Sequence, residues 1–159
     1  MTSHVKVVLF AWGNPSRGDD GVGPWFADCF RDRADKGFIL VEDFQLQVEH
    51  LLDCQRGQLL LFVDACMADS ASYRFTRLGE NSDLAHTSHA LSPEELLGQY
   101  RRVLGQAPPP AFQLAIPGKN FELGSAMSAA TRECCGRGAV LVEELLACPD
   151  CSSWMLRVS

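Results

Sequence analysis

Apolar and amphipathic segments alternate along the chain. Residues 5–12 and 58–65 are mostly apolar, as in strands that are buried on both faces of a sheet. Shorter strand-like segments lie at residues 38–41, 73–78 and 111–116. Segments with a helical pattern lie at residues 24–34, 48–54, 92–104 and 128–147. This alternation predicts a three-layer α/β/α sandwich around a twisted, mostly parallel sheet, in which one edge strand can run antiparallel.

Two of these segments carry further signals. Polar and apolar residues alternate at 73–78, which is typical of an edge strand with one solvated face. The helix at 92–104 has a strong start, because Ser92 can cap it, Pro93 fits its first turn and Glu95 completes a capping box. We therefore expect an exposed sheet edge at 73–78 and a well-defined helix beginning at Ser92.

The length of 159 residues favours one domain. We expect a single α/β domain over residues 1–147 and a C-terminal tail over residues 148–159. The chain has 14 Lys and Arg against 20 Asp and Glu, a net charge of −6, and no basic cluster, which argues against a nucleic-acid partner. No stretch approaches the ~20 apolar residues that a membrane span requires.

A cytoplasmic location is expected. The apolar run at 5–12 is ended by Gly13-Asn14-Pro15 without a cleavage site, so it does not read as a secretory signal. The seven cysteines, an odd number, are then expected to be reduced thiols. Cys148 and Cys151 form a lone CxxC after a helical segment, which favours an incidental pair over a zinc or redox site.

The glycine-rich loop at residues 13–23 follows the first strand. Gly13 and Gly18 have the spacing of a phosphate-binding P-loop, but Asp19 and Asp20 stand where that motif needs Lys and a hydroxyl residue. A carboxylate there would repel a phosphate. The two acids can complement the dipole of the following helix, with Asp19 as a cap, or offer oxygen ligands to a metal ion.

Further carboxylates follow two other predicted strands. Asp64 comes after five apolar residues, where a charge inside the strand would be costly, so we expect it at the strand's end. Glu42 and Asp43 follow the strand at 38–41 in the same way. Because ligand sites of open α/β sheets lie beyond the carboxyl ends of their strands, these acids are expected at one rim.

Imidazole is the remaining ligand type. His86 and His89 lie in the loop before the helix that Ser92 caps, whereas His4 is near the N-terminus and His50 lies on a predicted helix, so both make weaker candidates. Two carboxylates and one histidine, with coordination positions left open, would suit a divalent transition metal.

These residues together resemble a known family, the hydrogenase maturation endopeptidases. The resemblance rests on the loop from Gly13 to Gly23, on Val63-Asp64-Ala65 and on His89, and extends through residues 43–50 and 121–128. Members of that family remove the C-terminal extension from the large subunit of nickel-iron hydrogenases after nickel has been inserted. The family's fold is a three-layer sandwich around a twisted sheet, which agrees with the pattern above.

The resemblance implies roles for four residues. Asp20, Asp64 and His89 fall on the family's metal-contacting positions, where the first is Glu in some members, and Asp43 matches a further acidic position near the cleft. The nickel would be supplied by the precursor and no organic cofactor would be needed. Separately from the resemblance, we expect the protein to be a monomer. The absence of G-x-S-x-G and H-E-x-x-H motifs agrees with a peptidase that has no Ser or Cys nucleophile and no zincin site.

Two alternatives use the same residues. A metal-dependent hydrolase of a small substrate would bind its own ion tightly. A non-catalytic, nickel-sensing assembly chaperone would bind the precursor and release it uncut. Either activated metal-bound water or a cleft carboxylate such as Asp20 or Asp43 can serve the peptidase reaction, and sequence does not separate these routes.

Overall fold

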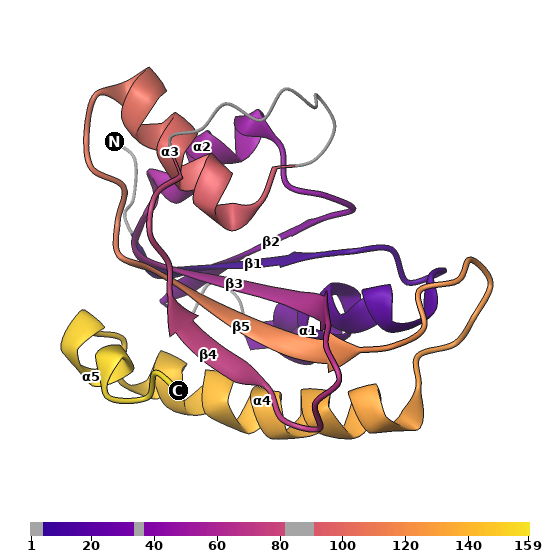
Figure 1. The fold of residues 1–159 in the computed structure, drawn as a ribbon. Coiled ribbons are helices and arrows are strands. Elements are labelled where there is room, and N and C mark those ends of the chain that lie inside the picture. Colours follow the sequence, from indigo (N-terminus) through magenta and orange to yellow (C-terminus); the bar gives the residue numbers. More distant parts are fainter. Residues whose placement is uncertain (1–4, 34–36, 82–90) are drawn as a thin grey trace.

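The computed structural model describes residues 5–33, 37–81 and 91–159 and contains a five-stranded sheet. The strands are β1 (Val5–Trp12), β2 (Phe38–Asp43), β3 (Gly57–Met67), β4 (Arg74–Arg77) and β5 (Ala111–Gly118). Their order across the sheet is β2-β1-β3-β5-β4 (Figure 1). All neighbours are parallel except β4, which pairs antiparallel with β5 at one edge. The predicted mostly parallel sheet with an antiparallel edge strand is confirmed.

Helices cover both faces of this sheet. They are η1 (Gly18–Gly21), α1 (Val22–Phe30), η2 (Arg31–Arg33), η3 (Val48–His50), α2 (Leu51–Cys54), α3 (Pro93–Leu104), α4 (Ala129–Ala147) and α5 (Cys151–Met155). In Figure 1, α2 and α3 lie above the sheet, whereas α1, α4 and α5 lie below it. The three-layer sandwich is therefore confirmed, and no helix within the described ranges is long and apolar enough to cross a membrane.

The predicted helix starts agree with the structure. Ser92 caps α3 by accepting a hydrogen bond from the backbone N of Glu95 at 3.1 Å. Ser128 caps α4 in the same way for Thr131 at 3.3 Å. The segment predicted as one helix at 48–54 is instead a 3-10 turn, η3, that continues into the short α2.

The position of Asp64 differs from its prediction. Asp64 lies inside β3, which continues to Met67, rather than at the strand's end. β3 extends this far because β5 pairs with it up to Gly118, whereas its register with β1 ends at Ala11 and Val63. Asp64 is thus one residue beyond the last pair with β1, where the loop after β1 leaves the sheet.

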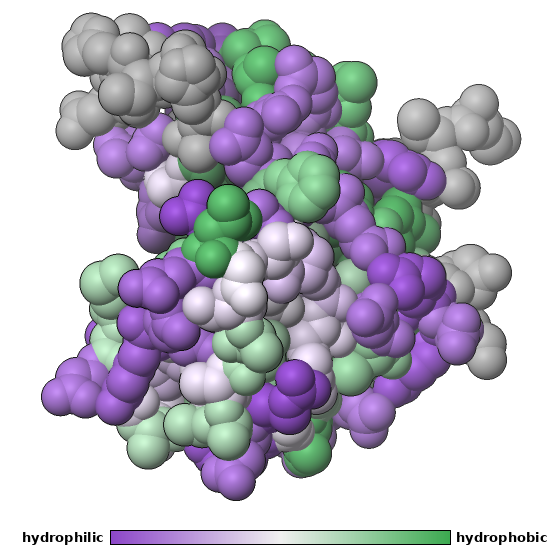
Figure 2. All heavy atoms as spheres, turned by 90° about the vertical axis from the view of Figure 1, so that its right-hand side faces the viewer, coloured by the Kyte–Doolittle hydropathy of each residue, from purple (hydrophilic) through white to green (hydrophobic). Residues whose placement is uncertain are grey.

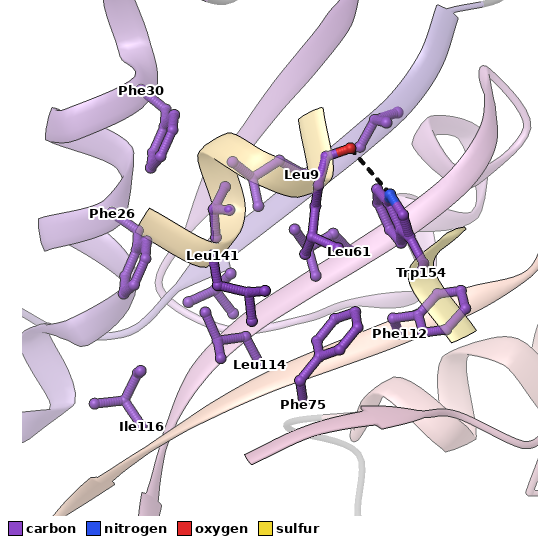
Figure 3. Packing of buried hydrophobic residues seen from close by; sticks show 14 of the residues in the cluster. Leu9, Phe26, Phe30, Leu61, Phe75, Phe112, Leu114, Ile116, Leu141 and Trp154 are labelled. Carbon is purple, nitrogen blue, oxygen red and sulfur yellow. Dashed lines mark hydrogen bonds between the residues drawn. The ribbon is translucent and has the colours of Figure 1, made fainter. Parts of the chain in front are cut away.

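One core cluster fills the space between the sheet and α1 and α4. Phe26 and Phe30 of α1 are fully buried and point into this layer together with Leu141 of α4 (Figure 3). Trp154 of α5 is also fully buried, and its indole Nε1 donates to the carbonyl oxygen of Leu145 at 3.0 Å. The segment expected as a tail is therefore packed into this core through Trp154.

The C-terminal residue lies against the edge of the sheet. The backbone N of Ser159 donates to the carbonyl oxygen of Phe75 in β4 at 2.9 Å. The backbone N of Phe75 donates to Ser159 Oγ at 3.1 Å. The last residue thus uses a donor and an acceptor of the edge strand.

A second cluster lies on the opposite face, under α2 and α3. Phe10 of β1 and Phe62 of β3 stack with ring centroids 4.6 Å apart, and Leu96 of α3 is fully buried against them. The ring of His50 in η3 meets Phe10 edge-on at a centroid distance of 6.2 Å. This packing fixes η3 near the carboxyl edge of the sheet, where Asp20, Asp43 and Asp64 lie.

Candidate active site at the carboxyl edge

The loop after β1 turns sharply to bring Asp20 back to the strand's end. Gly13 has a φ of 142°, and a Cβ there would lie 2.2 Å from the carbonyl oxygen of Asp20, so only glycine fits. The backbone N of Asn14 donates to Asp20 Oδ2 at 2.7 Å. The Asp20 carboxylate is therefore held against the loop and directly beyond the end of β1.

Asp19, the neighbouring acid, has a structural role. It is fully buried, and its carboxylate accepts hydrogen bonds from the backbone N atoms of Lys119, Asn120 and Ser128 at 2.8, 3.1 and 2.7 Å. Burial acts to raise its pKa, but these hydrogen bonds outweigh burial and lower the pKa from its ordinary value. Asp19 thus ties η1 to the segment between β5 and α4.

Asp64 is a largely buried carboxyl group on the neighbouring strand. Its pKa is raised to about 7, chiefly by burial and further by the nearby Asp20 carboxylate. A hydrogen bond from the backbone N of Ala65 at 2.8 Å acts in the opposite direction and lowers the pKa. The structure therefore brings Asp20 and Asp64 close enough for their charges to repel. Such a pair can share a proton or bind a cation, since either neutralises the repulsion.

Asp43 ends β2 at the same edge. Its carbonyl oxygen accepts from the backbone N of Gly13 at 3.1 Å, which joins it to the loop that carries Asp20. Its carboxylate accepts from the backbone N of Phe44 at 2.7 Å through Oδ1, and Oδ2 lies 3.3 Å from Nε2 of His50. With 39% of its side chain exposed, Asp43 can face a bound molecule.

A pocket of about 380 Å³ opens beside these residues. It is lined by Ala11, Gly13, Pro15, Pro24, Glu42, Asp43 and Phe44. Phe44 is 70% exposed. Figure 2 views this carboxyl edge and shows neutral and hydrophobic residues near the centre of the face, with hydrophilic residues around them. A pocket lined by apolar residues and by the two acids Glu42 and Asp43 suits a short polypeptide segment better than an anion.

His89 lies outside the described residues, and so does His86. Among the residues that the structure describes, no group of three or more His, Cys, Asp and Glu side chains is placed to hold a metal ion. Asp20 and Asp64, two of the three predicted ligands, lie near each other, and metal binding by Asp20, Asp64 and His89 stays a prediction.

His50 is the residue that sequence reasoning undervalued. Its position on a predicted helix made it a weak candidate, yet the structure buries it beside Asp43. The sequence signal that could have found it is its place at the end of the segment 43–50. This segment begins with Asp43, and the chain folds back so that His50 contacts Asp43. Spacing alone does not show that return, because it depends on how residues 44–47 fold.

Comparison with known proteins identifies related folds. No family model matches the chain, and no curated protein does. Among solved structures, the [NiFe] hydrogenase maturation protease HycI from Thermococcus kodakarensis KOD1 aligns with a TM-score of 0.67 and 18% identity, covering 90% of this chain and 93% of that protein. The hydrogenase maturating endopeptidase HybD from E. coli aligns with a TM-score of 0.69 and 14% identity, covering 88% and 91%.

A third structure agrees. The hydrogenase 2 maturation peptidase from a Thaumarchaeota archaeon aligns with a TM-score of 0.65 and 17% identity, covering 89% of this chain and 98% of that one. At sequence identities this low, the structural alignments establish that the fold is shared and nothing further. The family that the sequence resembles is therefore one whose solved structures share the fold of this chain along nearly its whole length.

Proposed function

We propose that this protein is a hydrogenase maturation endopeptidase, which removes the C-terminal extension from a nickel-loaded large-subunit precursor of a nickel-iron hydrogenase. The observation that carries the proposal is the Asp20–Asp64 pair, whose charges interact at the carboxyl edge of the sheet. It lies on a fold shared with maturation proteases. The motifs on which the family resemblance rests include the same two acids.

Substrate recognition would use the nickel ion of the precursor. Carboxylate oxygens and imidazole nitrogens are ligands that divalent transition metals accept, so Asp20, Asp64 and His89 are the residues proposed to contact the ion. The raised pKa of Asp64 has a consequence here, because an approaching cation favours the ionised form that burial and Asp20 disfavour. Precursor without nickel would leave this repulsion uncompensated and would bind less well.

Cleavage then needs a water molecule and a base. A carboxylate at the rim, Asp43 or Asp20, takes a proton from water as the water oxygen attacks the scissile carbonyl carbon. The C–N bond breaks when the leaving nitrogen takes up that proton, giving a new carboxylate and a free amine. The chain's own groups proposed for this step are the partly buried Asp20 and the exposed Asp43.

The proposed setting is a monomer in the cytoplasm, with the hydrogenase precursor as its partner. Incubation of the protein with nickel-loaded and nickel-free precursor, followed by mass spectrometry, tests the function. Loss of a C-terminal fragment only from the nickel-loaded precursor supports the proposal. A precursor that binds but keeps its mass indicates a chaperone instead. Stoichiometric metal in the purified protein without precursor indicates a metal-dependent hydrolase.

A further inference from the structure

We propose that His50 is a positioning residue that orients the carboxylate of Asp43, one of the residues that line the pocket, an inference that rests on the proposed function. His50 is buried in η3 with 8% of its side chain exposed, whereas Asp43 ends β2 with 39% exposed. The imidazole thus lies behind the carboxylate, between Asp43 and the ring of Phe10.

The hydrogen bonds of the imidazole define its protonation state. His50 Nδ1 accepts a hydrogen bond from the backbone N of Gln47 at 2.8 Å, so Nδ1 carries no proton. A neutral imidazole then has its proton on Nε2, the atom that lies 3.3 Å from Asp43 Oδ2. The two nitrogens of His50 therefore have different roles, with Nδ1 facing the Gln47 amide and the Nε2–H group lying next to Asp43 Oδ2.

This arrangement restricts the orientation of the Asp43 side chain. Oδ1 accepts a hydrogen bond from the backbone N of Phe44, and Oδ2 lies 3.3 Å from His50 Nε2, so each oxygen has a protein group beside it. A carboxylate has further lone pairs on both oxygens, and these remain for a substrate group or a water molecule in the pocket that Asp43 lines. Because the His50 imidazole packs against the buried ring of Phe10, it is a rigid support for the Asp43 carboxylate.

Two substitutions at position 50 separate positioning from simple structural support. An Asn side chain reaches about as far as Nδ1, so His50→Asn keeps an acceptor for the Gln47 amide and loses the donor to Asp43. A Gln side chain reaches about as far as Nε2, so His50→Gln keeps the donor and loses the acceptor. We expect His50→Asn to lower kcat for precursor cleavage about 10- to 100-fold with KM little changed, while His50→Gln stays close to wild type.

The opposite ranking overturns the proposal. If the imidazole only caps η3, His50→Asn retains cleavage and His50→Gln loses it. Equal cleavage by both variants and wild type also overturns it. A double variant with Asp43→Asn completes the test, because a positioning residue adds no further loss in kcat once its partner is gone.

A measurement on the unaltered protein keeps the proposal testable if the variants fail to fold. Nitrogen-15 NMR of the histidine side chains should show His50 as the neutral tautomer with its proton on Nε2, and Asp43→Asn should shift that proton's resonance. A proton on Nδ1 overturns the pair. Wild-type protein that leaves nickel-loaded precursor at full mass overturns the proposed function itself, which is a different outcome from unequal variants of an active enzyme.

Discussion

The carboxylate of Asp19 accepts two hydrogen bonds from Ser128, one from its backbone N at 2.7 Å and one from its hydroxyl at 3.1 Å. These residues are 109 positions apart in the sequence. Ser128 is also the N-cap of α4, so one buried carboxylate connects the first functional loop to the start of the longest helix. These hydrogen bonds attach the loop that carries Asp20 to the N-terminus of α4.

Asp19 and Asp20 should respond oppositely to substitution. Asp19→Ala leaves buried backbone N–H groups without an acceptor and should lower the free energy of unfolding by on the order of 3 kcal/mol. Asp20→Asn keeps a side-chain acceptor for Asn14 and should stay folded while cleavage of the precursor is lost. Urea denaturation with a parallel cleavage assay checks both, and an active Asp20→Asn variant would remove Asp20 from the site.

Asp64 should make stability fall as the pH rises. Its folded pKa of about 7 lies above the ~3.9 of an unfolded Asp, so the folded state binds more protons between these values. The contribution of Asp64 is fully present below about pH 4 and is lost as the pH passes through 7. Asp64→Asn removes this loss and should be more stable than wild type at pH 8 by ~2–4 kcal/mol, with little difference at pH 4.

Urea denaturation of both proteins at several pH values measures that difference. The difference between the two proteins is the informative quantity, because other groups such as Asp19, whose pKa is lowered, make the stability of both fall at low pH. A stability gap that does not change with pH would show that Asp64 has an ordinary pKa.

His89 should be required for cleavage and not for folding. His89→Ala should leave the melting temperature unchanged and abolish cleavage of nickel-loaded precursor, because one proposed ligand of the substrate's metal is removed. The matched control is His86→Ala, three residues earlier in the same loop, which should remain active. Loss of cleavage in the control alone would assign the role to His86.

Trp154 should contribute strongly to stability. It is fully buried between Phe75 and Phe112, with ring centroids at 6.4 and 5.3 Å. Trp154→Ala should lower the free energy of unfolding by about 3–5 kcal/mol, measured by denaturation monitored by circular dichroism. Leu156→Ala, two residues later and 86% exposed, is the control and should change it by less than about 0.5 kcal/mol.

The sequence predicts most of this fold because its elements have clear local signals. The apolar runs at 5–12 and 58–65 become the central strands, and Ser92 and Ser128 cap the helices that follow them. The sequence predicts Asp64 at the end of β3, and this is wrong because the length of β3 is set by its pairing with β5, a contact between distant residues. The sequence does not define the role of Asp19, because its partners lie about 100 positions away.

In the candidate site, too, features with local sequence signals are predictable, whereas those that depend on contacts between separate segments are not. Strand ends and glycine spacing place Asp20 and Asp43 at one edge without a structure, since parallel strands must end together. The contact between Asp43 and His50 depends on an irregular turn between them, for which periodicity gives no signal. His89 remains a prediction from the family resemblance.

The contact between Ser159 and Phe75 also bears on self-association. A peripheral strand with unpaired amide and carbonyl groups is a template for strands of other molecules, which leads to aggregates. Ser159 occupies the outward donor and acceptor of Phe75, in the middle of a strand only four residues long. Deleting residues 156–159 would uncover that template, and the shortened protein should form intermolecular β-structure at concentrations where the 159-residue chain stays dispersed.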